Sequence, residues 1–422
     1  MTINKLPPKF SKNVIALISG TVLAQLVPIL VSPIITALYS PEDFGQFAIF
    51  MAIAGIIGSI ATLRYEITIV LPDNTKDASN LLVISLLITA FISIITWALV
   101  SIYPKWLVKT FELTSCANFL YLIPVSVAAI GVYQSFNYWS ISINQFRNNA
   151  ISKITQTSSN ALVNIVLGKL KYGGVGLVIG QITGQLISGL FLMFQTIIQS
   201  KNEFKGISIK EIKAKVIEYR KHAVINTSHV LIDASLNHGL SFFLLLFFGN
   251  NLVGLYAFSF RILKAPLAII GRSMGQAFYK EASDYKNTSK PLGELILNIY
   301  KKQFLIGIIP FSMLFIFAPT LFEAVFGNNW TEAGVISQII TPWLFLNFIA
   351  SPISGITIIG KKQRMAVVLT LIDMVLKFTA LCIGNIYNDY LLAFKLISTF
   401  GCCLMVFDLI WYLKIAKGLS NN

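Results

Sequence analysis

The chain has 422 residues, of which 55% are hydrophobic and 12% are charged, and its formal net charge is +15. The charged share is about half that of an ordinary soluble domain, so the composition leaves no room for a sizeable aqueous domain and predicts a polytopic membrane protein. The basic residues lie in connectors between apolar runs and not on one folded face, which argues against nucleic-acid binding and indicates topology signals and contacts to anionic lipid.

Twelve apolar stretches fill the chain from end to end. A spanning helix needs about 20 apolar residues, because the hydrocarbon core is roughly 30 Å thick and a helix rises about 1.5 Å per residue. The first stretch is too long for the apolar core of a signal peptide, so we expect it to be retained. The expected spans are 13–38, 44–64, 79–103, 117–140, 152–168, 174–198, 222–248, 252–274, 303–321, 333–359, 365–385 and 390–413.

The basic residues also predict the orientation of the spans. With the N-terminus in the cytoplasm, 27 of the 33 Lys and Arg residues fall on the cytoplasmic side, counting Arg261, Lys264 and Arg272 of the eighth span. The opposite connectors hold Lys105, Lys109, Lys169 and Lys171, while Lys377 and Lys395 lie within spans. This asymmetry places both termini in the cytoplasm. The outer connectors are short, which argues against a membrane glycosyltransferase or polymerase with a large external catalytic loop.

The first span carries polar side chains on one side and two internal prolines. The polar residues are Thr21, Gln25, Ser32 and Thr36, and the prolines are Pro28 and Pro33. Proline kinks a helix and frees backbone carbonyls. A gating helix and a passive kink both fit this pattern.

The two halves of the chain resemble each other where the second and eighth spans begin. Gly45, Phe47 and Ala48 correspond to Gly254, Tyr256 and Ala257, each 209 residues further on. Six spans on each side of a central connector give both halves the same orientation, as in transporters with parallel repeats. The alternative is that helix starts favour glycine and small residues in any case.

The seventh span contains the richest polar pattern. His222, Asn226, His229, Asp233 and Asn237 recur every three or four residues and so share one helix face. One interpretation is a face that lines a water-filled cavity, where His229 and Asp233 bind a coupling ion or a proton. The other is hydrogen bonding between helices that holds the halves together. A single helix face rarely supplies a full set of zinc ligands, so we expect no metal site.

Three further charged residues lie near mid-depth in the second half. Arg261 in the eighth span can bind phosphate through two hydrogen bonds, or it can pair with Asp233. Asp373 and Lys377 in the eleventh span are one turn apart, so they can neutralise each other or line a cavity. Intramembrane charges are costly and mark candidate functional sites.

Several stretches are similar to polysaccharide exporters, and more narrowly resemble Wzx-type O-antigen flippases of the multidrug/oligosaccharidyl-lipid/polysaccharide (MOP) superfamily. They are Arg64–Pro72, Pro41–Ala48, Gly176–Gln185 and Gly254–Pro266. The resemblance implies flipping of an undecaprenyl-pyrophosphate-linked oligosaccharide. It also implies that Arg64, Glu66 and Arg261 line the substrate cavity, although Arg64 and Glu66 also fit plain anchoring at the membrane interface.

Together these observations predict an all-α membrane protein with two pseudo-symmetric six-helix bundles around a central cavity. The bundles are 1–200 and 222–422, joined by a basic cytoplasmic connector, 201–221. We expect the cavity to include Lys377, Gln25 and Asn226 as well as Arg64, Glu66 and Arg261, and ion coupling to use Asp233, His229 and Asp373.

The predicted function is alternating-access flipping of a lipid-linked O-antigen or capsule repeat unit across the bacterial inner membrane. A cation-coupled drug antiporter of the same superfamily and a membrane glycosyltransferase or polymerase are the alternatives. No nucleotide-binding loop or nucleophile–base arrangement appears, so we expect no ATPase but a transporter with no enzymatic activity and no cofactor. We also expect it to be a monomer. Its expected partners are the lipid-linked oligosaccharide, membrane lipids, a polysaccharide polymerase and a chain-length regulator.

Overall fold

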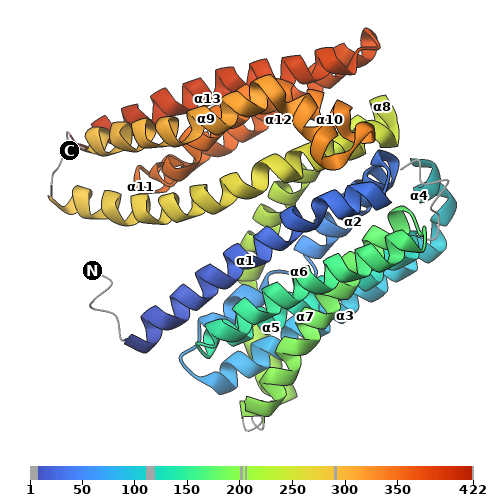
Figure 1. Ribbon diagram of the computed structural model, residues 1–422. Helices are drawn as coiled ribbons and strands as arrows, with labels where there is room; N and C mark the ends of the chain where they lie inside the picture. Colours follow the sequence, from blue (N-terminus) through green and yellow to red (C-terminus); the bar gives the residue numbers. More distant parts are fainter. Residues whose placement is uncertain (1–7, 111–118, 200–202, 205–206, 289–291, 421–422) are drawn as a thin grey trace. The chain divides into compact units, whose positions relative to one another are not determined.

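The computed structural model describes residues 8–110, 119–199, 203–204, 207–288 and 292–420. All the regular secondary structure in these ranges is helical (Figure 1). Contacts group the chain into two compact units, Met1–Phe242 and Phe243–Asn422, which we call the N-terminal unit and the C-terminal unit. The expected separation of two bundles by the connector 201–221 stays a prediction.

The helices follow the apolar stretches closely. The N-terminal unit contains α1 (Pro8–Leu38), α2 (Pro41–Ser59), η2 (Tyr65–Val70), α3 (Thr75–Ile102), α4 (Pro104–Thr110), α5 (Ile123–Ser142), α6 (Phe146–Lys169) and α7 (Gly174–Gln199). Helix α8 (Ile209–Thr288) begins in this unit and ends in the next, with a non-helical residue at Gly249. The C-terminal unit continues with α9 (Leu292–Phe326), η5 (Asn328–Trp330), α10 (Thr331–Ala350), η6 (Ser351–Ile353), α11 (Ile356–Ile359), α12 (Gln363–Ile386) and α13 (Tyr390–Ser420).

The all-α fold with twelve predicted spans is confirmed. Within the described ranges, nine helices are long and apolar enough to cross a membrane. One of these is α8, which holds two predicted spans because Gly249, with a φ of 78°, interrupts it between them. Helices α2 and α6 coincide with the remaining two predicted spans.

Two predicted spans extend further than their helices. Helix α2 ends at Ser59 rather than at residue 64, because Leu63 and Arg64 adopt left-handed backbone conformations with φ of 45° and 60°. Helix α10 ends at Ala350 and is followed by short helical turns, not by a regular span to residue 359. Pro352 accounts for this break, because proline has no N–H for the helical hydrogen bond.

The start of α2 ties two helices of the N-terminal unit together. The Asp43 carboxylate accepts a hydrogen bond from the Ser40 backbone N–H, while the Ser40 hydroxyl accepts one from the Asp43 N–H. This reciprocal arrangement is a capping box. The other Asp43 oxygen accepts a hydrogen bond of 2.7 Å from the N–H of Gly174, the first residue of α7. One carboxylate therefore caps two helices.

Helix α7 packs against α6 through a row of small residues. Gly176, Gly180, Gly184 and Ser188 recur every fourth residue and are all buried. A Cβ atom on Gly184 would lie 2.5 Å from the backbone carbonyl oxygen of Gln156 on α6. Small residues at this spacing allow two membrane helices to approach closely. The glycines of the stretch Gly176–Gln185 therefore form a packing surface.

The pattern of helix contacts supports the internal repeat. In the N-terminal unit, α3 packs on α5, α5 on α7 and α6 on α7. The helices six spans later pair in the same way, with α9 on α10, α10 on α13 and α12 on α13. The contact of α1 with α6 also has a counterpart, because the Phe243 ring of α8 lies 4.6 Å from the Phe378 ring of α12. These four helix pairs therefore recur in the second half of the chain.

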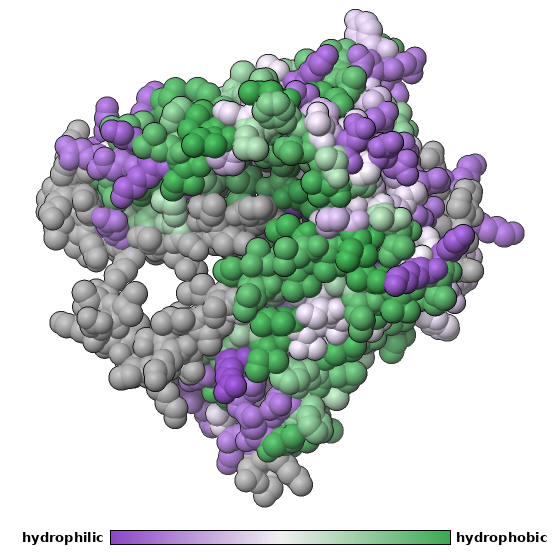
Figure 2. Space-filling view, viewed as in Figure 1, coloured by the Kyte–Doolittle hydropathy of each residue, from purple (hydrophilic) through white to green (hydrophobic). Residues whose placement is uncertain are grey.

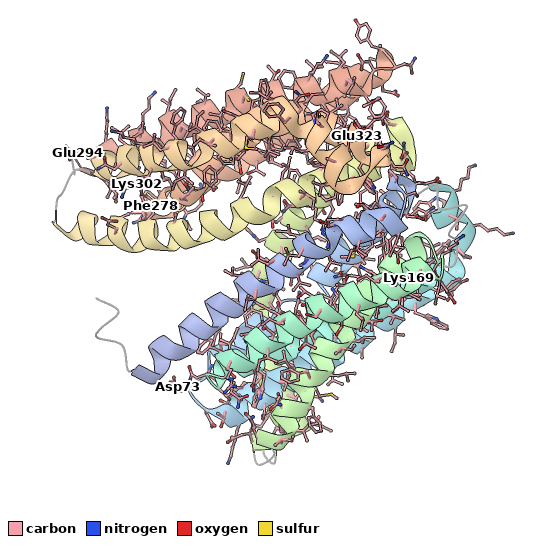
Figure 3. The ribbon with its side chains drawn as sticks, in the orientation of Figure 1. Asp73, Lys169, Phe278, Glu294, Lys302 and Glu323 are labelled. Atoms are coloured by element: carbon pink, nitrogen blue, oxygen red, sulfur yellow. The ribbon has the colours of Figure 1, made fainter. Side chains whose placement is uncertain are left out.

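The surface is that of a membrane protein. On the face shown in Figure 2, hydrophobic residues cover the middle stretches of the helices, and hydrophilic residues gather towards their ends. Figure 3 shows Asp73 and Lys169 at opposite ends of the N-terminal unit, and Glu294 and Glu323 towards opposite ends of the C-terminal unit. This distribution matches a multi-pass protein with its polar groups at the two membrane interfaces.

Candidate functional site

The Arg-Tyr-Glu motif after α2 forms an ion pair at the surface of the N-terminal unit. Arg64 Nη1 lies 3.0 Å from Glu66 Oε1, and Arg64 retains 23% of its side-chain exposure whereas Glu66 has 0%. The Thr62 hydroxyl donates a hydrogen bond to the second Glu66 oxygen. Both charged residues of this motif are predicted from the sequence to line the substrate cavity. In the structure, the Arg64 side chain is partly exposed and the Glu66 side chain is fully buried. Glu66 therefore holds the Arg64 guanidinium through this ion pair.

The middle residue of the motif contacts the connector between the halves. The Tyr65 hydroxyl donates a hydrogen bond of 3.0 Å to the backbone carbonyl of Val216 in α8. Nearby, Lys215 Nζ lies 2.9 Å from carboxylate oxygens of both Asp77 and Glu218. Val216 and Lys215 belong to the first turns of α8. The basic connector is thus attached to η2 and to the first turn of α3.

The enclosure of Glu66 leads to a prediction about pH. Burial raises the pKa of its carboxyl, and the Thr62 hydroxyl and Arg64 only partly oppose this. A raised pKa in the folded state means that the stability contributed by this group is present at low pH and is lost as pH rises through that pKa. We expect Glu66→Gln, which keeps the side-chain shape, to remove this dependence in a thermal denaturation series.

The matched variant Glu66→Ala should behave differently. It leaves Thr62 without its acceptor and Arg64 without its counter-ion, so we expect the free energy of unfolding to fall by about 2–4 kcal/mol at all pH values. Equal melting temperatures for the Ala and Gln variants across the pH series would contradict this role for Glu66.

The polar face of the seventh span lies in the N-terminal unit. His222, His229, Asp233 and Asn237 are exposed, and Asn226 is partly buried. The amides of Asn226 and Asn237 donate to backbone carbonyls one turn earlier, at 2.7 Å and 2.8 Å. Among the described residues, the side chains of His229 and Asp233 have no hydrogen-bond or ion-pair partner. Both side chains are therefore exposed and unpaired within the described part of the chain.

Helices α1 and α6 enclose a second polar group in this unit. Gln25 on α1 is partly buried, and its Oε1 atom has no hydrogen-bond partner. One turn earlier on α1, the Thr21 hydroxyl accepts a hydrogen bond of 3.2 Å from Lys153 Nζ of α6. A cation therefore lies on the same side of α1 as Gln25.

Arg261 is an exposed cation of the C-terminal unit. It lies twelve residues beyond the break at Gly249, or about 18 Å along the helix at 1.5 Å per residue. Within the described part of its own unit, the guanidinium makes no ion pair or hydrogen bond. Lys264, one turn further, places its ammonium group 4.8 Å from the centre of the Phe260 ring.

The charges of the eleventh span pair with each other. Lys377 Nζ lies 2.5 Å from Asp373 Oδ2, as one of the two readings of their spacing predicts. The same ammonium group lies 4.5 Å from the centre of the Trp343 ring of α10. Both side chains are mostly buried, with 18% exposure for Lys377 and 28% for Asp373. The pair thus lies among packed helices.

Two charged residues were not recognised from the sequence as parts of a site. Lys153 lies at the start of the expected span 152–168, but α6 begins at Phe146, so Lys153 lies two turns inside the helix. Asp408 was not considered, although it interrupts the apolar run of the last span and an intramembrane carboxylate is a signal in itself. The same rule that identified Asp373 would have found Asp408.

The comparisons with known proteins agree with this architecture. A lipid II flippase MurJ in an inward closed conformation matches with a TM-score of 0.70 and 13% identity, over 96% of this chain and 90% of that chain. A multidrug resistance MATE family transporter of the MOP superfamily, inward-facing, matches with a TM-score of 0.68 and 14% identity, over 96% of each chain. Its outward-facing form matches with a TM-score of 0.61 and 14% identity, over 100% of this chain and 98% of that chain. These matches show the fold of twelve-helix MOP superfamily transporters.

No curated protein sequence matches the chain. The sequence profile of a family described as "Polysaccharide biosynthesis protein" matches residues 34–335. This range extends from the first span into α10 and includes the Arg-Tyr-Glu motif, the α7 glycines and Arg261. The chain is therefore a multi-pass membrane protein with a MOP transporter fold, and it belongs to the polysaccharide biosynthesis protein family.

Proposed function

We propose that this protein translocates an undecaprenyl-pyrophosphate-linked oligosaccharide, a repeat unit of O-antigen or capsule, from the inner to the outer leaflet of the bacterial inner membrane. The polar head of such a substrate cannot cross hydrocarbon unaided, because its hydroxyl and phosphate groups would lose their hydrogen bonds. A polar path through the protein lets the head cross while the polyprenyl tail stays in lipid. Alternating access of the two halves would expose that path to each side in turn.

The observation that carries this proposal is the exposure of the Arg261 side chain within a predicted span. Among the described residues of its unit, this exposed cation at span depth has no ion-pair partner, which is costly unless it meets water or an anion. Guanidinium binds phosphate oxygens through two parallel hydrogen bonds. We therefore assign the pyrophosphate to Arg261, with Arg64, Lys377, Gln25 and Asn226 as further polar groups along the path.

The proposed coupling groups are His229, Asp233 and Asp373. The side chains of His229 and Asp233, which have no partner among the described residues, fit binding of a proton or a cation, which would reset the carrier after release of the substrate. In this scheme both termini lie in the cytoplasm, the protein acts as a monomer without a cofactor, and a polysaccharide polymerase and a chain-length regulator work on the flipped product.

The test is deletion of the gene followed by analysis of lipid-linked sugars. We expect repeat units to accumulate on the inner leaflet and surface polysaccharide to disappear, with recovery when the wild-type gene is returned. Transport by the purified protein in vesicles, with a labelled undecaprenyl-pyrophosphate oligosaccharide, should confirm the activity. Unchanged surface polysaccharide would contradict the proposal.

A second candidate is a cation-coupled exporter of small molecules. The structural similarity to a multidrug resistance MATE family transporter, with a TM-score of 0.68, favours it. The deletion experiment separates the two functions, because loss of an exporter changes drug tolerance and leaves the lipid-linked sugars unchanged.

A further inference from the structure

The first turns of α8 dock on the N-terminal unit through one helix face. Ile212 and Tyr219 pack against an apolar cluster formed by residues of η2, α3, α5 and α7, and Ala223 belongs to that cluster. On the same face, Lys215 pairs with Asp77 and retains only 13% of its side-chain exposure. Positions 212, 215, 219 and 223 recur every three or four residues, so a single face carries all these contacts.

The opposite face of these turns carries basic residues that the unit leaves unpaired. Four exposed positions, spaced three or four residues apart, form a stripe along the helix. They are Lys210, Lys213, Ile217 and Lys221, which we call the basic stripe. Among the described residues, its three lysines make no ion pair and no hydrogen bond. The acidic residues of these turns, Glu211 and Glu218, lie roughly 100° to the side, and Glu218 is bound to Lys215.

The basic stripe continues directly into an apolar surface. Val224, Ile225 and Ile232 follow it on the same side of α8, and their exposed fractions are 65%, 69% and 54%. These residues belong to the predicted seventh span, where exposed apolar side chains contact lipid. The side of the helix that carries His229 and Asp233 lies about a third of a turn away. One face of α8 therefore passes from the hydrocarbon region to the basic stripe without interruption.

The middle of the stripe lies at the depth of the lipid headgroups. Ile217 is 63% exposed and is the last apolar residue of this face before Lys213. The headgroups add about 5–7 Å on each side of the hydrocarbon, and one helical turn rises about 5.4 Å. Lys213 lies one turn beyond Ile217, and Lys221 lies one turn nearer to the hydrocarbon, from where its long stem can extend to the headgroups. Both ammonium groups therefore reach this layer.

We propose that the basic stripe binds anionic phospholipid in the leaflet at this end of the N-terminal unit. Lys213 and Lys221 bind phosphate oxygens of the headgroups, Ile217 contacts the acyl chains, and Lys210 adds attraction at longer range. The bound lipid presses the connector onto η2 and the start of α3, where the Tyr65 hydroxyl already donates a hydrogen bond to this part of α8. Anionic lipid thus stabilises the docked connector.

The composition of the stripe favours a phospholipid over a soluble anion or an acidic protein. A soluble phosphate gains nothing from the exposed Ile217, whereas a phospholipid satisfies the lysines and covers this side chain together. The structure also separates lysines that are alike in sequence. Lys215 is occupied by carboxylates on the docking face, so it takes no part in binding lipid. The proposal does not depend on the identity of the transported substrate.

The test compares two lipids and needs no transport assay. The full-length protein in detergent is titrated with phosphatidylglycerol or with phosphatidylcholine, and the midpoint of thermal unfolding is measured at low ionic strength, where charge attraction is least screened. We expect phosphatidylglycerol to give the larger stabilisation. In Lys213→Gln/Lys221→Gln, the phosphatidylglycerol concentration at half of this effect should rise by roughly 10–30-fold, because each basic residue near an anionic surface contributes about fivefold. An unchanged concentration would overturn the proposal.

Lys215→Gln is the matched control, because it removes a lysine of the same turns that lies on the docking face. We expect it to lower the midpoint in both lipids and to leave the half-effect concentration of phosphatidylglycerol unchanged. A rise as large as that of Lys213→Gln would overturn the assignment to one face.

Two further measurements keep the test decisive if the double variant folds poorly. Ile217→Ser removes the apolar part of the stripe, so we expect the half-effect concentration to rise by about 3–10-fold. Glycerol phosphate, which is a headgroup without acyl chains, should not reproduce the stabilisation. If Ile217→Ser has no effect, or if glycerol phosphate stabilises the protein as well as phosphatidylglycerol does, the ligand is not a lipid and the proposal is wrong. The flipping of lipid-linked sugars has its own, separate test.

Discussion

Replacement of Arg261 by alanine is expected to reduce transport of the lipid-linked oligosaccharide by roughly 10–100-fold. Hydrogen bonds to charged groups contribute about 1.5–3 kcal/mol, and each 1.4 kcal/mol is about tenfold in an equilibrium constant. Among the described residues of its unit, Arg261 has no partner that could compensate for its loss or be left unpaired by it. The variant should therefore fold normally and fail in transport, measured in vesicles with the labelled substrate.

Two further variants sharpen this result. Arg261→Lys keeps the charge but loses the two parallel hydrogen bonds, so we expect an intermediate rate. Lys395→Ala removes an exposed cation of α13 near the outer end of the last span, where a lysine can reach the headgroups, and should leave transport unchanged. If Arg261→Ala transports the substrate at the wild-type rate, the assignment of the pyrophosphate to Arg261 is wrong. The same holds if the Arg261 and Lys395 variants lose transport equally.

Replacement of Gly184 by alanine should destabilise the N-terminal unit. The added Cβ atom would lie 2.5 Å from the carbonyl oxygen of Gln156 and 3.1 Å from the Cβ atom of Asn160. The first contact is with backbone, which cannot move aside as a flexible side chain can, so α6 and α7 must separate. We expect a loss of about 1–3 kcal/mol in the free energy of unfolding, measured by thermal denaturation in detergent.

The chain offers a matched control for this substitution. Gly418 lies near the end of α13, and a Cβ atom there meets nothing within 4 Å. Gly418→Ala should therefore be neutral, or stabilising by up to about 1 kcal/mol, because alanine is the better helix former. If both variants melt at the same temperature, the row of small residues on α7 does not hold α6 in place.

The spans were predictable from the sequence because each apolar stretch is long enough to satisfy its own backbone in lipid. The break at Gly249 falls between the seventh and eighth predicted spans, and α1 ends at Leu38 as expected. The ends of α2 and α10 were less predictable. A residue with a left-handed backbone conformation, such as Arg64, or a proline, such as Pro352, ends a helix even where the stretch predicted as a span continues.

The candidate site was only partly predictable. Helical spacing correctly placed Asp373 beside Lys377, because residues one turn apart meet on any helix. It could not show that Glu66 is enclosed while Arg64 is accessible, since both lie at the same membrane boundary. It also could not place Lys153 beside Thr21, which lies on a helix more than a hundred residues earlier in the chain.

The sequence by itself determined that the chain spans a membrane and how many spans it has, because these depend on runs of apolar residues. The orientation expected from the distribution of basic residues stays a prediction. The tertiary structure decided which polar groups are enclosed, which are paired and which remain free. That outcome depends on which helices pack together, and the close approach of α6 and α7 at Gly184 is set by contacts between residues distant in sequence. Asp408 illustrates the difference: its charge can be read from the sequence, but the absence of a partner in the described structure cannot.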